Sequence, residues 1–115
     1  MKLAHLLLTT FLSAPLVAFA SEPVNIDIYL AGELAQSATL NGYRSFFSFA
    51  PKNLPNTRLE LRLIAPEPLI FDLKETTLDG EIIQRIKLPT PGSSFDVSEI
   101  KGTKLHNAYV FVRPN

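Results

Sequence analysis

Residues 57–65 have the sequence Thr-Arg-Leu-Glu-Leu-Arg-Leu-Ile-Ala, and this stretch decides the fold class. Three leucines alternate with three charged residues between Arg58 and Leu63. Successive side chains of a β-strand point to opposite faces of its sheet, so a period of two predicts a strand with one buried and one solvated face. We expect Leu59, Leu61 and Leu63 to point into a core.

The same alternation recurs on both sides of this stretch. Further strands are expected at 24–30, 34–40, 43–50, 69–74, 82–88 and 105–113. Asn41-Gly42 predicts a hairpin, because both residues tolerate positive φ. Ser98 and Glu99 predict one helical turn that Gly102 ends. The last strand is apolar on both faces, which favours a central position in its sheet.

Short strands at spacings of about ten residues, without a long helical pattern, are typical of an all-β domain. The pattern fits a small antiparallel β-sandwich of immunoglobulin-like type, or a small barrel, with about seven to eight strands. The immunoglobulin-like assignment depends on size and strand count alone, since the usual core tryptophan and cysteine pair are absent from the sequence.

The first twenty residues have the pattern of a removable signal peptide. Met1-Lys2 is a short positive start, an apolar stretch follows over residues 3–19, and Ala18-Phe19-Ala20 places small side chains where a signal peptidase cleaves. Polar residues and Pro15 interrupt the apolar stretch, whereas a membrane anchor needs about 20 apolar residues in succession. We therefore expect cleavage after Ala20, a single domain over residues 21–115, and no stable membrane anchor.

Charge and cysteine content narrow the classes of function. Eleven Lys and Arg balance eleven Asp and Glu, so no electrostatic attraction to nucleic acid or anionic lipid is expected. The chain contains no cysteine, although small exported domains often depend on disulfides. A disulfide-free exported domain fits a bacterial periplasm better than a eukaryotic secreted protein. We expect a periplasmic or secreted protein that is stabilised by packing and strand pairing.

The sequence offers few groups for catalysis or metal binding. His106 is the only histidine after residue 20, whereas zinc and copper sites need several nitrogen or sulfur ligands. We expect His106 to face solvent. Acidic residues such as Asp72 and Glu75 are interleaved with Arg and Lys, which is typical of a solvated sheet face. No phosphate-binding glycine loop or serine elbow occurs, so we predict no enzyme activity, metal or cofactor.

One expected strand has an unusual concentration of aromatic side chains. Tyr43-Arg44-Ser45-Phe46-Phe47-Ser48-Phe49 contains four aromatic residues, with Phe46 and Arg44 on the opposite face from the other three rings. One interpretation is that all four rings fill the core or pack under a loop. The other is that Phe46 and Arg44 are exposed and bind a partner, because aromatic and arginine side chains are common hot-spot residues. The candidate partner-binding residues are Tyr43, Arg44, Phe46 and Phe47.

A second candidate site is a set of four basic residues. It comprises Arg58, Arg62, Arg85 and Lys87. Arg58 and Arg62 share a strand face with Glu60 between them, which favours a solvated surface with cross-strand ion pairs. An anionic ligand site is the alternative.

These observations favour a non-catalytic module that binds another exported or envelope protein, or an accessory subunit of an envelope complex. Two alternatives stay open. One is a β-sandwich module that binds a small ligand or a glycan, although the chain lacks tryptophan, the best stacking platform for sugars. The other is a protomer of a homo-oligomeric envelope structure, which would make the partner a second copy of the chain.

Overall fold

The computed structural model describes residues 23–115. The signal peptide expected at residues 1–20 lies outside the described residues. The described chain is all-β, as predicted, and contains eight strands and one short 3₁₀ helix, η1. These elements are β1 (Val24–Leu30), β2 (Glu33–Leu40), β3 (Phe46–Phe49), β4 (Arg58–Pro66), β5 (Leu69–Thr77), β6 (Gly80–Leu88), β7 (Ser94–Asp96), η1 (Val97–Glu99) and β8 (Tyr109–Val112).

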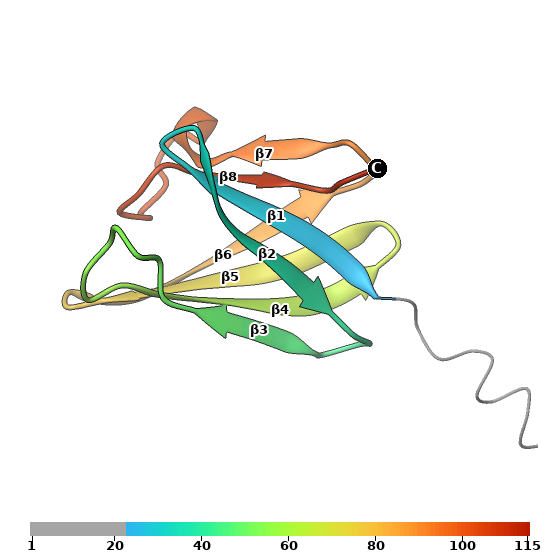
Figure 1. Cartoon of the computed structure of the whole chain (residues 1–115), viewed down its shortest axis with the longest axis horizontal. Coiled ribbons are helices and arrows are strands. Elements are labelled where there is room, and N and C mark those ends of the chain that lie inside the picture. The colour runs from blue at the N-terminus through green and yellow to red at the C-terminus, as the bar shows by residue number, and fades with distance from the viewer. Residues whose placement is uncertain (1–22) are drawn as a thin grey trace, which may run out of the picture.

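The strands form two antiparallel four-stranded sheets (Figure 1). One sheet has the order β2-β1-β8-β7, and the other has the order β3-β4-β5-β6. β8 lies between β1 and β7, so the central position predicted for the last strand is confirmed. β2 contacts β3 and β6 contacts β7 without sharing a hydrogen-bond ladder.

The strand order does not match an immunoglobulin-like sandwich. That architecture pairs its strands in the orders ABED and CFG, which bring strands distant in sequence side by side. Here almost every strand lies beside its neighbour in sequence, and β8 closes against β1. The immunoglobulin-like assignment is therefore not confirmed, because strand count and size do not specify which strands pair.

The hairpin predicted at Asn41-Gly42 is wrong. Gly42 does adopt a positive φ of 89°, but β2 and β3 belong to different sheets. Residues 41–45 therefore connect the sheets, and Arg44 also takes a positive φ of 68°. Only the positive φ of Gly42 agrees with the prediction, and the pairing of the strands on either side depends on the packing of the whole domain.

Other differences concern the ends of elements. The strand expected at 43–50 is shortened to β3 (Phe46–Phe49), and the last strand begins at Tyr109 rather than at Leu105. The short strand β7 was not predicted from the sequence. The predicted helical turn is present as η1, but its N-cap is Asp96, whose carboxylate accepts a hydrogen bond from the backbone N–H of Ser98 (2.9 Å).

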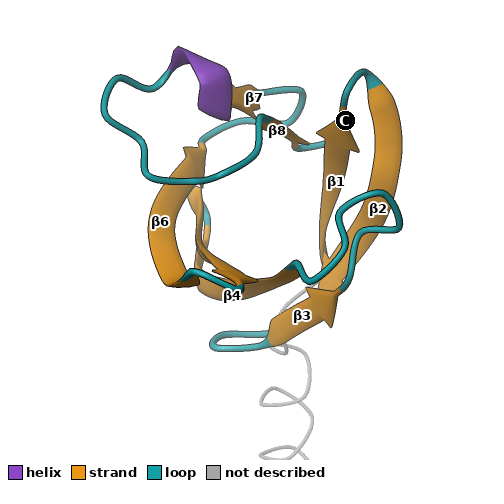
Figure 2. Cartoon of the chain, turned by 90° about the vertical axis from the view of Figure 1, so that its left-hand side faces the viewer, coloured by secondary structure: helices purple, strands orange, loops and turns teal. Residues whose placement is uncertain are grey.

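The core lies between the two sheets and follows the alternation of the sequence. Leu59, Leu61 and Leu63 are fully buried, as predicted. The rings of Phe71 in β5 and Phe111 in β8 meet edge-on, with centroids 5.5 Å apart, and so join one sheet to the other. An end-on view shows both sheets arranged around this common interior (Figure 2).

Candidate functional site

The most exposed aromatic side chains of the described chain lie at and just before β3. The side chain of Phe46 is 60% exposed, and Tyr43 is 68% exposed. The guanidinium of Arg62 in β4 lies 5.6 Å from the ring centroid of Phe46, and that of Arg44 lies 5.6 Å from the ring of Tyr43. We call Tyr43, Arg44, Phe46 and Arg62 the aromatic–arginine surface.

Alternation along β3 explains why Phe46 is exposed. Phe46 pairs with Arg62, and both point to the outer face of the sheet. Phe47 and Phe49 point the other way, are half-buried, and pack against the core. Of the four residues predicted to bind a partner, the structure therefore places Tyr43, Arg44 and Phe46 at the surface and Phe47 largely beneath it.

The position of Tyr43 differs from the prediction. The sequence alternation placed Tyr43 on the same face as Phe47 and Phe49, but Tyr43 precedes the strand and is exposed. The positive φ of Arg44 interrupts the extended backbone between them. Backbone hydrogen bonds hold this connection in place, from Arg44 N–H to the Leu63 carbonyl (3.2 Å) and from Ser45 N–H to the Gly42 carbonyl (3.1 Å).

The four basic residues of the second candidate site do not gather at one point. Arg58 and Arg62 lie on β4, whereas Arg85 and Lys87 lie on β6, with β5 between them. Arg85 binds both carboxylate oxygens of Asp72 on β5, at 2.8 and 3.1 Å.

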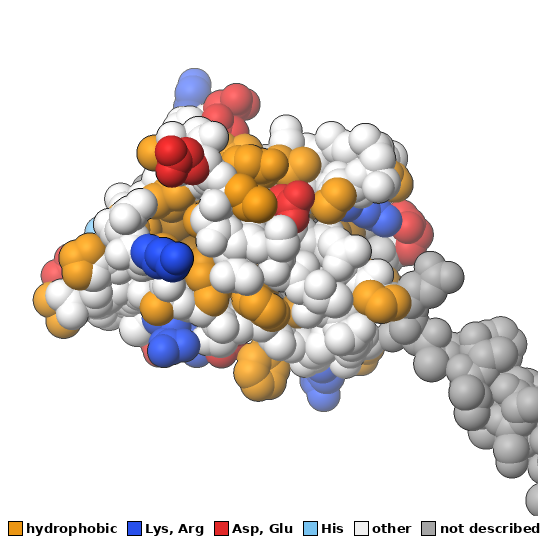
Figure 3. All heavy atoms as spheres, viewed as in Figure 1, with side chains coloured by type: hydrophobic (Ala, Val, Ile, Leu, Met, Phe, Trp, Pro, Cys, Tyr) orange, Lys and Arg blue, Asp and Glu red, His pale blue; other side chains and the backbone are white. Residues whose placement is uncertain are grey.

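Arg62 lies 3.8 Å from Glu60 on the same strand, and Lys74 on β5 lies 3.9 Å from Glu60. These contacts form a solvated sheet face on which charges of opposite sign alternate. Figure 3 likewise shows Lys, Arg, Asp and Glu side chains scattered over the face turned to the viewer.

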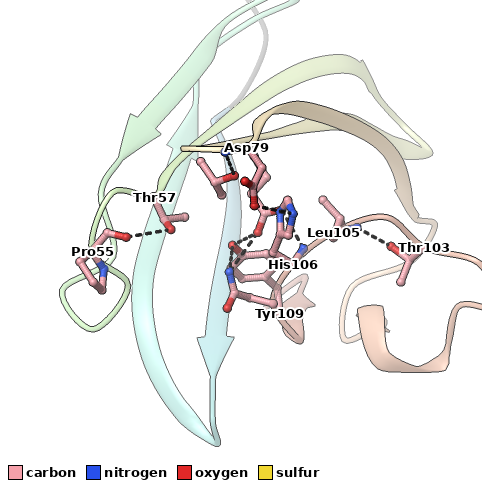
Figure 4. A network of polar contacts seen from close by, with 10 residues as sticks. Pro55, Thr57, Asp79, Thr103, Leu105, His106 and Tyr109 are labelled. Atoms are coloured by element: carbon pink, nitrogen blue, oxygen red, sulfur yellow. Dashed lines mark hydrogen bonds and ion pairs between the residues drawn. The ribbon is translucent and has the colours of Figure 1, made fainter.

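A buried polar cluster lies in the interior near one end of the two sheets (Figure 4). Its centre is Glu75 of β5, which is fully buried. The Glu75 carboxylate accepts hydrogen bonds from the Tyr109 hydroxyl (2.5 Å), the Asn107 side-chain amide (3.1 Å) and the His106 backbone N–H (2.8 Å). These three donors belong to the C-terminal segment that enters β8.

His106 lies at the outer end of this cluster. Its Nδ1 atom is 3.1 Å from Glu75 Oε1, and its Nε2 atom is 3.7 Å from Asp79 Oδ2 in the turn before β6. The side chain of His106 is 39% exposed. His106 is exposed, as expected, but one side of its ring also contacts a buried carboxylate.

The hydrogen bonds decide the charge state of Glu75. Burial by itself raises the pKa of this carboxyl, but the hydrogen bonds from Tyr109, His106 and Asn107 together outweigh burial and lower its pKa. Burial and the neighbouring Glu75 carboxylate raise the pKa of the Tyr109 hydroxyl well above its usual range. Tyr109 is thus a stable hydrogen-bond donor to an ionised Glu75.

The interpretation of Glu75 as a solvated surface residue is wrong. Leu69, Phe71 and Leu73 point into the core, and the same period of two places Glu75 on their face. Extending this alternation by one residue would have identified Glu75 as buried. Nothing in the sequence identified its partners, because they lie more than thirty positions away along the chain.

The cluster lacks the parts of a nucleophilic or metal centre within residues 23–115. Both ring nitrogens of His106 lie near carboxylates, and no serine or threonine hydroxyl is hydrogen-bonded to them. No group of three His, Cys, Asp or Glu side chains is arranged to hold a metal ion in this part of the chain. The geometry of Glu75 and its partners fits a structural polar cluster.

The described residues include no helix with the length and apolar character that a membrane span requires.

Comparison with known proteins identifies no relative: no protein-family model, curated protein or solved structure matches the chain. The function therefore has to be argued from the surface and the interior of this domain.

Proposed function

We propose that the protein is an exported, non-catalytic module that binds another protein through the aromatic–arginine surface. The observation that carries this proposal is the exposure of Tyr43 and Phe46, each beside an arginine, at one edge of a sheet. Aromatic rings that are largely exposed gain little for folding, whereas aromatic and arginine side chains supply much of the binding energy in protein interfaces.

Two further observations support the proposal. The first twenty residues have the pattern of an export signal, so the partner is expected in the periplasm, in the envelope or outside the cell. The His106 ring contacts carboxylates rather than a hydroxyl nucleophile, which favours a structural role for this histidine over a catalytic one.

The test is in-cell crosslinking of the tagged full chain in its natural host, followed by mass spectrometry of the captured proteins. We expect one reproducible envelope or exported partner, whose capture falls strongly in Arg44→Ala and Phe46→Ala. Ile83→Ala is the matched control, because Ile83 is 65% exposed on β6 at the opposite edge of the same sheet.

Three outcomes would contradict the proposal. Capture that is equal in the wild type, Arg44→Ala and Phe46→Ala would place the binding surface elsewhere. Capture of the chain alone would support a homo-oligomer. Absence of any captured protein, together with specific retention on a glycan array, would replace a protein partner by a sugar.

A further inference from the structure

β3 has a free edge in its sheet. It pairs with β4 and has no hydrogen-bonded neighbour on the other side within the described chain. The Leu63 N–H donates to the Ser45 carbonyl (2.9 Å). This bond shows which residues of β3 are hydrogen-bonded to β4 and which face the free edge. Since bonding alternates along an antiparallel strand, Phe47 and Phe49 direct their N–H and C=O groups toward β4, and Phe46 and Ser48 direct theirs away from it.

There is an opening beside this edge. β2 is the next strand in space, but β2 and β3 diverge from their connection at residues 41–45 (Figure 1). Where they have separated, a surface hollow lies between the β1–β2 hairpin and the loop after β3. It is lined by Leu30, Glu33, Leu34 and Ala35 on one side and by Pro51, Lys52 and Asn53 on the other. Leu34 is 53% exposed, so the hollow offers an apolar side chain among polar ones close to the end of β3.

Basic residues outnumber acidic ones along this edge, where Glu33 lines the hollow and Glu60 of β4 pairs with Ser48. From Leu34 to Leu59 the sequence contains no Asp or Glu, whereas it contains Arg44, Lys52 and Arg58. Arg58 donates a hydrogen bond to the Ser48 hydroxyl (3.1 Å), which holds its guanidinium over β3. Within residues 23–115, Arg44 and Arg58 form no ion pair with a carboxylate, in contrast to Arg62 and Arg85.

We infer that the free edge of β3 binds an extended, acidic segment of the partner protein by β-strand addition, and that Arg44 and Arg58 pair with the acidic side chains of that segment. This inference rests on the proposed function and specifies how the partner is recognised. The unpaired N–H and C=O groups of Phe46 and Ser48 supply main-chain hydrogen bonds, and the exposed ring of Phe46 packs against an apolar side chain of the added strand.

The same observations disfavour a second copy of this chain as the occupant. If two copies paired through their β3 edges in antiparallel orientation, Arg44 at the start of one β3 would lie near Arg58 at the end of the other. Like charges that face each other across strands are destabilising. An acidic segment instead relieves the unpaired positive charge, so charge complementarity favours a different protein.

The test uses protein purified after expression of the full chain, and random linear peptides displayed on phage. We expect selected peptides to be enriched in Asp and Glu that alternate with apolar residues. Binding of a selected synthetic peptide should weaken roughly tenfold in Arg44→Glu and in Arg58→Glu, because each reversal removes a close charge pair. Lys101→Glu is the control, since it makes the same change of charge at an exposed residue in the loop after η1.

Two measurements identify strand addition without a variant that could unfold. Bound peptide should slow hydrogen exchange at the backbone amides of Phe46 and Ser48. Two versions of the peptide carry N-methyl groups on alternate backbone nitrogens, one on the odd-numbered and one on the even-numbered residues. Only one version should lose binding, because methylation removes the hydrogen-bond donors of one edge of the peptide strand and only one edge faces β3. Equal binding by both methylated peptides would overturn the inference.

The outcomes separate this inference from the proposed function. Selected peptides without acidic enrichment, or with unchanged affinity for Arg44→Glu and Arg58→Glu, would overturn the acidic-strand inference. A partner captured in cells through Phe46 would still support the proposed function in that case. If no peptide is selected and the molecular mass of the protein in solution increases with its concentration, the partner is a second copy of the chain. That outcome would contradict both the acidic-strand inference and the proposed function.

Discussion

The hydroxyl of Tyr109 in β8 donates a hydrogen bond to the buried carboxylate of Glu75 in β5, and this contact joins the two sheets through a charged group. Glu75 is fully buried, and its carboxylate has hydrogen-bond partners at both oxygens. A buried carboxylate is costly unless such partners are present. The segment from His106 to Tyr109 is therefore required to stabilise β5 as well as β8.

Tyr109→Phe should lower the free energy of unfolding by about 2 kcal/mol, because it removes a donor to a buried charge while keeping the ring in place. Urea denaturation measures this change. Tyr29→Phe is the matched control, since Tyr29 is half-buried and its hydroxyl has no hydrogen bond within residues 23–115. Equal effects of the two substitutions would show that the Glu75 contact adds nothing to stability.

Stability should fall as the pH drops below the ordinary pKa of a glutamate, about 4.5. The folded state lowers the pKa of Glu75, so the unfolded state takes up the proton first, and protonation favours unfolding. The contribution of Glu75 is present above pH 4.5 and is lost as the pH falls through its lower folded-state pKa. Urea midpoints measured from neutral to acid pH should decline less steeply in Glu75→Gln. An unchanged slope would show that Glu75 is not responsible.

The alternation of the sequence was enough to predict every strand except β7 and most of the core, because the period of two is a local property. Leu59, Leu61 and Leu63 are buried as predicted, and the same rule applied one residue further would have placed Glu75 among them. Strand pairing is not local. At Asn41-Gly42 only Gly42 takes the positive φ expected of the turn, and the segment joins strands of different sheets.

At the aromatic–arginine surface, too, local features could be predicted from the sequence and contacts between strands could not. The exposure of Phe46 follows from its alternation with the half-buried Phe47. The contact of Arg62 with Phe46 could not be predicted, because it depends on the register of β3 against β4. The Glu75 cluster likewise depends on how the C-terminal segment packs against β5.

Ala31→Asn should stabilise the domain by about 0.5–1 kcal/mol. Ala31 and Gly32 form the two-residue turn between β1 and β2, with φ of 53° and 81°. Positive φ at both positions is typical of a type I′ turn, in which Asn-Gly is strongly preferred and alanine is strained. Thermal unfolding measures the gain. Ala50→Asn, at an exposed position after β3, controls for the change of side chain alone. A loss of stability in Ala31→Asn would contradict the turn assignment.

Phe46→Ala should lower the free energy of unfolding by less than about 1 kcal/mol, whereas Phe71→Ala should lower it by about 3–5 kcal/mol. Phe46 is 60% exposed, so its removal leaves no cavity in the core. Phe71 is fully buried and packs edge-on against Phe111. Urea denaturation of both variants provides the comparison, with Ile83→Ala as the exposed control on the same sheet.

This comparison decides what the exposed ring is for. A small loss of stability in Phe46→Ala, combined with lost partner capture, would mean that Phe46 acts in binding and contributes little to the fold. A loss as large as that of Phe71→Ala would mean that Phe46 stabilises the connection between the sheets, most directly through its contact with Arg62. Lost capture in Phe46→Ala would then reflect unfolding, and Arg44→Ala, which removes an exposed charge at the same edge, would become the variant that tests the binding surface.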